Sequence, residues 1–132
     1  MTLYLPDTSA WILSFSSVCP PALKTVMETA LLEDRVQTGG VIVAELLQGC
    51  RSARERKPLQ ERLMALHYLE WGEEDWMTLG GTGSELRSKG VSVPLTDLII
   101  ALLALRHSST ILHRDRHFDL MARHLPLKLE KV

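Results

Sequence analysis

The sequence has little of what marks secreted or membrane proteins. Its two cysteines, Cys19 and Cys50, lie far apart, a usage that fits free thiols in a reducing compartment. The longest apolar run, residues 98–105, falls far short of the ~20 residues of a bilayer span. The N-terminal segment MTLYLPDTS lacks the basic start and long apolar stretch of a secretory signal. We therefore expect a cytoplasmic protein without membrane contact.

The chain also lacks an excess of one charge and is poor in aromatic residues. Fifteen Lys and Arg residues face sixteen Asp and Glu residues, and aromatic residues make up 5% of the sequence. Neither long-range attraction to nucleic acid nor base stacking on aromatic platforms is expected. The 132 residues are 45% hydrophobic, which predicts one compact domain, residues 1–132, that buries roughly two-thirds of its unfolded surface.

Short strand-like segments alternate with helical patterns along the chain. We expect strands at residues 3–5, 36–38, 68–70, 110–112 and 127–129. Helices are expected after residues 7–9 and after Gly39–Gly40, and over about 20–32, 53–66, 74–89, 97–106 and 118–124, with Thr96 able to cap the sixth. Glycines at 80, 81 and 83 either interrupt the fifth helix or mark close packing. This alternation predicts a three-layer α/β/α domain with a mainly parallel sheet.

Four carboxylates stand where such a sheet places functional groups, outside the carboxyl ends of its strands. Asp7 follows the first expected strand and Asp115 the fourth, while Asp97 begins the most hydrophobic helix. Glu45 lies near the start of the helix after the second strand. We expect these four side chains to meet at one edge of the sheet.

Clustered carboxylates repel one another, and a divalent cation relieves that repulsion. An oxygen-only ligand set suits Mg²⁺ or Mn²⁺ better than zinc. Such a cation activates water and polarises a phosphodiester without a protein nucleophile. The alternative is structural: Asp7 and Asp97 cap helices, Glu45 is a solvated helix residue and Asp115 forms a turn.

Four segments carry a family resemblance. Residues 7–12 (DTSAWI), 44–49 (AELLQG), 96–101 (TDLIIA) and 114–118 (RDRHF) resemble, in order, the acidic motifs of PIN-domain nucleases, and more narrowly those of VapC-type toxins of bacterial toxin–antitoxin pairs. The resemblance spans nearly the whole chain. One position departs from the pattern, because His113 stands where such proteins often carry threonine, two residues before the last acidic residue.

The resemblance implies an acidic site of Asp7, Glu45, Asp97 and Asp115, with Asp7 and Asp97 as direct metal ligands. Asp115 would complete the metal site, and Glu45 would bind metal or orient the attacking water. It further implies a PIN-like fold and Mg²⁺-dependent endoribonuclease activity on RNA, with Mn²⁺ able to substitute. A small cognate antitoxin, a homodimer, and contact with DNA only through the antitoxin are also implied.

Several alternatives remain open on the sequence. The rivals to this reading are a PIN nuclease of RNA processing without an antitoxin, an inactive PIN-like binding module, and a receiver-type phosphoacceptor domain. The two histidines at 113 and 117 suggest a zinc site. We disfavour it because the segment between them crosses a strand end and a turn, whereas four-residue spacing aligns ligands on a regular helix. The polar residues of this segment either contact RNA phosphates beside the metal or form a solvated loop; they are His113, Arg114, Arg116 and His117.

Overall fold

The computed structural model describes residues 1–132 as five short strands and seven helices. The strands are β1 (Tyr4–Pro6), β2 (Gln37–Thr38), β3 (His67–Tyr68), β4 (Thr110–His113) and β5 (Lys128–Lys131). The helices are α1 (Thr8–Phe15), α2 (Pro21–Leu32), α3 (Gly40–Gln48), α4 (Ala53–Met64), α5 (Glu73–Ser88), α6 (Leu95–His107) and α7 (Arg116–Met121). Every expected helix and strand is present, with shifted ends.

All strand pairs in the sheet are parallel. Strand β4 lies between β1 and β5, and β2 pairs with β3. A single bridge between Tyr4 and Val36 joins the two parts, so the strands run in the order β3, β2, β1, β4, β5. The predicted mainly parallel sheet is confirmed. Because β1 and β4 are adjacent and parallel, the residues that follow them emerge at the same edge.

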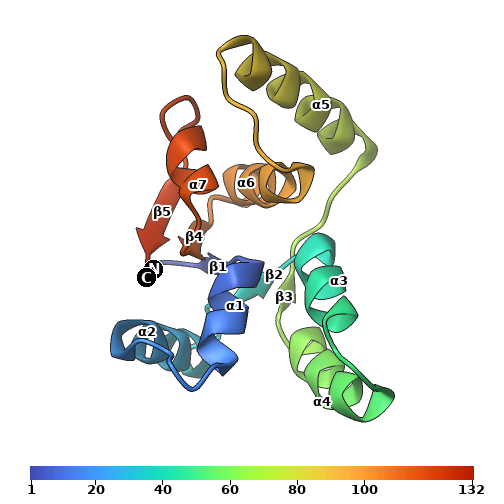
Figure 1. The fold of residues 1–132 in the computed structure, drawn as a ribbon, viewed down its shortest axis with the longest axis vertical. Coiled ribbons are helices and arrows are strands. Elements are labelled where there is room, and N and C mark those ends of the chain that lie inside the picture. The colour runs from blue at the N-terminus through green and yellow to red at the C-terminus, as the bar shows by residue number, and fades with distance from the viewer.

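Helices cover both faces of the sheet. In Figure 1, α5, α6 and α7 lie above the strands, whereas α1, α2 and α4 lie below them. The core centres on α6, which buries Leu98 and all residues from Ile100 to Ala104. Leu5 of β1 and Ile111 of β4 are register partners and are fully buried. The helix that carries the longest apolar run of the sequence therefore packs beside the central strands, as that run predicts.

Two helices begin earlier than the sequence suggested. Thr96 does not cap α6; the N-cap is Pro94, and the N–H of Leu98 donates to the Pro94 carbonyl at 3.1 Å. Asp97 therefore lies within the first turn instead of opening the helix. Helix α7 begins at Arg116 instead of residue 118, because the side chain of Asp115 caps it by accepting the N–H of His117.

Helix α5 continues through its three glycines. Its hydrogen-bonded span runs unbroken from Glu73 to Ser88, so of the two alternatives left open by the sequence, the interruption does not occur. A Cβ atom at Gly83 would lie 3.0 Å from Leu98 Cδ2, whereas at Gly80 and Gly81 it would meet nothing within 4 Å. Close packing against α6 thus explains Gly83 alone.

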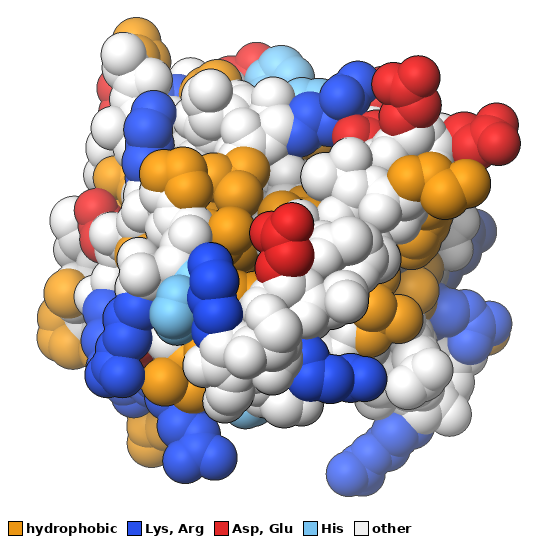
Figure 2. Space-filling model, turned by 90° about the horizontal axis from the view of Figure 1, so that it is seen from above, with side chains coloured by type: hydrophobic (Ala, Val, Ile, Leu, Met, Phe, Trp, Pro, Cys, Tyr) orange, Lys and Arg blue, Asp and Glu red, His pale blue; other side chains and the backbone are white.

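Charges of both signs are spread over the surface. Figure 2, seen from above Figure 1, shows basic and acidic side chains around gathered hydrophobic ones. Both cysteines are free, as expected. None of the helices is long and apolar enough to cross a membrane.

Candidate metal centre

Asp7 is a buried carboxylate at the end of β1. It is the N-cap of α1, and its Oδ1 accepts the N–H of Ala10 at 2.8 Å. The hydroxyl of Ser9 donates to the same carboxylate at 2.8 Å. Asp7 is only 2% exposed. Burial, together with the smaller effect of the charges of Asp115 and Asp97, raises its pKa to about 6 against the lowering effect of these two hydrogen bonds.

Asp97 and Asp115 face each other across a histidine. Asp97 comes from the first turn of α6 and Asp115 from the segment after β4. His117 Nδ1 lies 2.9 Å from Asp97 Oδ2 and 3.0 Å from Asp115 Oδ1. Burial and the charge of Asp115 raise the pKa of Asp97, while its hydrogen bond with His117 lowers it. These two carboxylates therefore carry unfavourable negative charge at close range.

Glu45 reaches the same region from α3. It lies in the C-terminal half of that helix, not near its start as predicted, because α3 already begins at Gly40. Its Oε1 accepts a hydrogen bond from the Thr8 hydroxyl at 2.7 Å, which ties it to the first turn of α1. Its charge contributes to the raised pKa of Asp97. Glu45 thus adds negative charge to the region from a separate element.

His113 supports Asp115 from beneath. The ring is fully buried and packs edge-on against Phe118, with ring centroids 5.2 Å apart. Its Nδ1 accepts the backbone N–H of Asp115 at 3.1 Å. Burial lowers the pKa of His113, which keeps the ring neutral and Nδ1 free to accept. His113 therefore supplies an acceptor beside Asp115, and the suggestion that it contacts RNA phosphates is wrong because it is buried.

His117 is the residue whose position the sequence reasoning missed. Asp97, Asp115 and His117 each place one ligand atom within 4.8 Å of the others, and His113 is not part of this group. The usable signal was the two-residue spacing from Asp115, which caps the first turn of α7 and so sets where His117 lies. Asp7 and Glu45 lie outside this tightest group but act on it by charge.

The donor set fits a divalent cation. No lysine or arginine forms an ion pair with Asp7, Glu45, Asp97 or Asp115, and His117 is the only basic partner of the group. Partly buried carboxylates without cationic partners are costly to keep, and a cation offsets that cost. The acidic cluster can therefore hold a metal ion.

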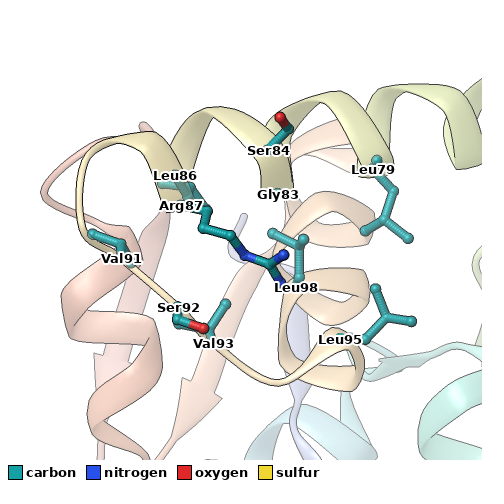
Figure 3. A pocket seen from close by; sticks show the side chains of 11 residues that line it. Leu79, Gly83, Ser84, Leu86, Arg87, Val91, Ser92, Val93, Leu95 and Leu98 are labelled. Carbon is teal, nitrogen blue, oxygen red and sulfur yellow. The ribbon is translucent and has the colours of Figure 1, made fainter.

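A separate hollow of about 440 Å³ lies between α5, the segment after it and α6. Figure 3 shows apolar side chains such as Leu79, Val93 and Leu98 around it, with Arg87 reaching across. Arg87 is its only charged lining residue, and none of the four carboxylates lines it. The cavity and the carboxylates with raised pKa values therefore lie at different places. Because perturbed pKa values are typical of functional sites, we take the acidic cluster as the candidate site.

Comparisons with known proteins agree with this geometry. The PIN domain family model matches residues 4–124. The chain is 30% identical over 126 residues to the VapC ribonuclease Mb1587 of Mycobacterium bovis and to ribonuclease VapC11 of Mycobacterium tuberculosis, with 92% of each chain covered. Its fold is similar to VapBC2 from Rickettsia felis bound to a promoter DNA fragment (TM-score 0.80, 19% identity, 99% of both chains). It is also similar to VapBC-1 from nontypeable Haemophilus influenzae (TM-score 0.79, 20% identity, 98% of both chains). The chain belongs to the PIN-domain family and, within it, to the VapC ribonucleases.

Proposed function

We propose that this protein is a metal-dependent endoribonuclease and the toxin of a toxin–antitoxin pair. Family membership supports RNA as the substrate. The observation that carries the proposal is the meeting of Asp97 and Asp115 beside a buried Asp7 without any lysine or arginine partner. A fold held for stability alone gains nothing from this arrangement, because each buried unpaired carboxylate opposes folding.

Each carboxylate has a proposed role. Asp97 and Asp115 hold the cation, and Asp7 holds it from the end of β1, where Ser9 and Ala10 fix the orientation of its carboxylate. Glu45 binds the metal or orients the attacking water, with Thr8 fixing one of its oxygens. A bound divalent cation lowers the pKa of water and stabilises charge on the phosphodiester. The carboxylate oxygens suit Mg²⁺, and Mn²⁺ is accepted by the same ligands.

The proposed partners follow from relatives. The similar VapBC structures are those of toxin–antitoxin systems, and one of them is bound to a promoter DNA fragment. We infer a small cognate antitoxin, a homodimer, and contact with DNA only through the antitoxin. Sedimentation of the purified chain at micromolar concentration tests the homodimer: twice the chain mass supports it, and a strict monomer contradicts it.

RNA cleavage tests the proposed activity. Purified protein is incubated with a mixed RNA pool in Mg²⁺ or in EDTA, and wild type is compared with Asp97→Asn. The matched control is Asp34→Asn, because Asp34 is exposed and its positive φ of 56° is one that asparagine tolerates. We expect cleavage by wild type and the control in Mg²⁺ only, and none by Asp97→Asn. Cleavage by Asp97→Asn at the wild-type rate contradicts the proposal.

A further inference from the structure

His117 points its ring into the acidic cluster. Its Nδ1 lies 2.9 Å from Asp97 Oδ2 and 3.0 Å from Asp115 Oδ1. Its backbone N–H also donates to Asp115 Oδ1 at 2.9 Å. The backbone and the ring of His117 therefore both contact the Asp115 carboxylate. Since Asp115 is the N-cap of α7, the cap fixes the position of the imidazole.

These separations match ligands around one metal ion. In octahedral coordination with bonds of about 2.1 Å, neighbouring ligand atoms lie about 3.0 Å apart. The nitrogen lies at this spacing from each of the two oxygens, and all three residues place a ligand atom within 4.8 Å of the others. A cation can thus take all three atoms with little rearrangement.

Neither the adjacent Arg116 nor any other arginine or lysine pairs with Asp97 or Asp115. Arg114 donates to the Val132 carbonyl at 2.6 Å, and Lys131 pairs with Asp119 at 3.3 Å. His117 is therefore the one basic group that contacts these carboxylates. Unlike a lysine or arginine, a neutral imidazole can offer its nitrogen lone pair to a metal.

We propose that His117 Nδ1 is a metal ligand beside Asp97 and Asp115, and that this nitrogen makes the centre prefer Mn²⁺ to Mg²⁺. Mg²⁺ takes oxygen ligands almost exclusively, whereas transition metals accept imidazole. The inference rests on the proposed metal-dependent function and refines its metal. When Nδ1 binds metal, the ring proton is on Nε2, and the ring is 26% exposed, so water can receive that N–H.

Calorimetric titration of the full chain with MnCl₂ and with MgCl₂ tests the preference without RNA. We expect wild type to bind Mn²⁺ at least about tenfold more tightly than Mg²⁺. His117→Ala should lose about tenfold or more of Mn²⁺ affinity and less than about threefold of Mg²⁺ affinity. His117→Asp, which offers oxygen instead, should shift the ratio back toward Mg²⁺. His124→Ala, at an exposed histidine, is the control and should match wild type.

Pulsed electron paramagnetic resonance of the Mn²⁺-loaded wild type tests separately whether a histidine nitrogen binds the metal, and this test does not depend on the folding of a variant. A directly bound imidazole produces hyperfine coupling to nitrogen, and selective isotopic labelling of histidine should change that coupling. Mn²⁺ bound without nitrogen coupling, or with unchanged affinity in His117→Ala, overturns the role of His117 but leaves the carboxylate site standing. No binding of either cation to wild type overturns both this inference and the proposed metal-dependent activity.

Discussion

Carboxylates on the surface of this molecule pair with arginine or lysine, whereas those at the carboxyl edge of its sheet do not. On the surface, Glu33 pairs with Arg35 at 2.7 Å and Asp119 with Lys131 at 3.3 Å. At the sheet edge, Asp7 is 2% exposed and has no lysine or arginine partner. The chain has fifteen lysines and arginines, so basic side chains are available, but none of them pairs with the carboxylates at the sheet edge.

This difference shows which carboxylates lower the stability of the folded chain. Exposed ion pairs contribute about 0–1 kcal/mol and are easily replaced. A buried carboxylate with a raised pKa, such as Asp7, opposes folding at neutral pH and is typical of a functional site. The two kinds of carboxylate should therefore respond differently to substitution and to pH.

The largest expected effect comes from two aspartates of the same short segment. Asp115 belongs to the acidic cluster, whereas Asp119 pairs with Lys131 at the surface. Asp115→Asn keeps a residue that caps helices well but removes a charged ligand, so cleavage of the RNA pool should fall at least about 100-fold. Asp119→Asn should change it less than about twofold. Equal losses in both variants would contradict the distinction.

A smaller effect is expected from pH. Asp7 must lose its proton to bind a cation, and its pKa in the metal-free protein is about 6. Metal affinity should therefore fall by up to about tenfold per pH unit below about 6 and level off above it. Titration calorimetry across this range measures the slope. A flat profile in wild type would show that Asp7 does not bind the metal.

The smallest effect should come from the residue beneath Asp115. His113→Leu removes the acceptor for the Asp115 N–H, leaving a partly buried donor unpaired at a cost of about 1–3 kcal/mol. His113→Asn offers an amide oxygen close to where Nδ1 stood. We expect the leucine variant to cleave RNA about tenfold more slowly than the asparagine variant. Equal rates, with both variants folded by circular dichroism, would rule out this positioning role.

Local pattern was enough to predict most elements of the fold. The helix from Pro21 to Leu32 and the buried helix around Ile100 follow from proline at a helix start and from a continuous apolar run. The parallel sheet follows from alternation of strands and helices. Helix starts were less predictable, because Thr96 is of the type that caps helices whereas the N-cap of α6 is Pro94, whose carbonyl accepts the N–H of Leu98.

The placement of the acidic residues could be predicted from the sequence, but the placement of the two histidines could not. Asp7 and Asp115 could be placed because each follows a strand of one parallel pair. His113 and His117 are four residues apart, yet one is buried under Asp115 and the other lies between two carboxylates. The spacing to the Asp115 cap places His117 in the first turn of α7, but only the packing of α6 against α7 brings Asp97 beside it.

The central claim is that the sheet-edge carboxylates are kept for metal chemistry at the expense of stability, and Asp7→Asn tests it most directly. The pKa of Asp7 rises from 3.8 to about 6 on folding. Between these values the unfolded chain loses its proton first, so the free energy of unfolding falls as pH rises, and the full cost of about 2–3 kcal/mol is present above about pH 6.

Urea unfolding in EDTA and RNA cleavage in Mg²⁺ are measured on wild type and Asp7→Asn. Asparagine does not titrate, so the variant should be about 2 kcal/mol more stable at about pH 7.5, with the difference shrinking toward about pH 4. It should also have lost RNA cleavage. A variant that is less stable than wild type at neutral pH, or that still cleaves RNA, would contradict the claim.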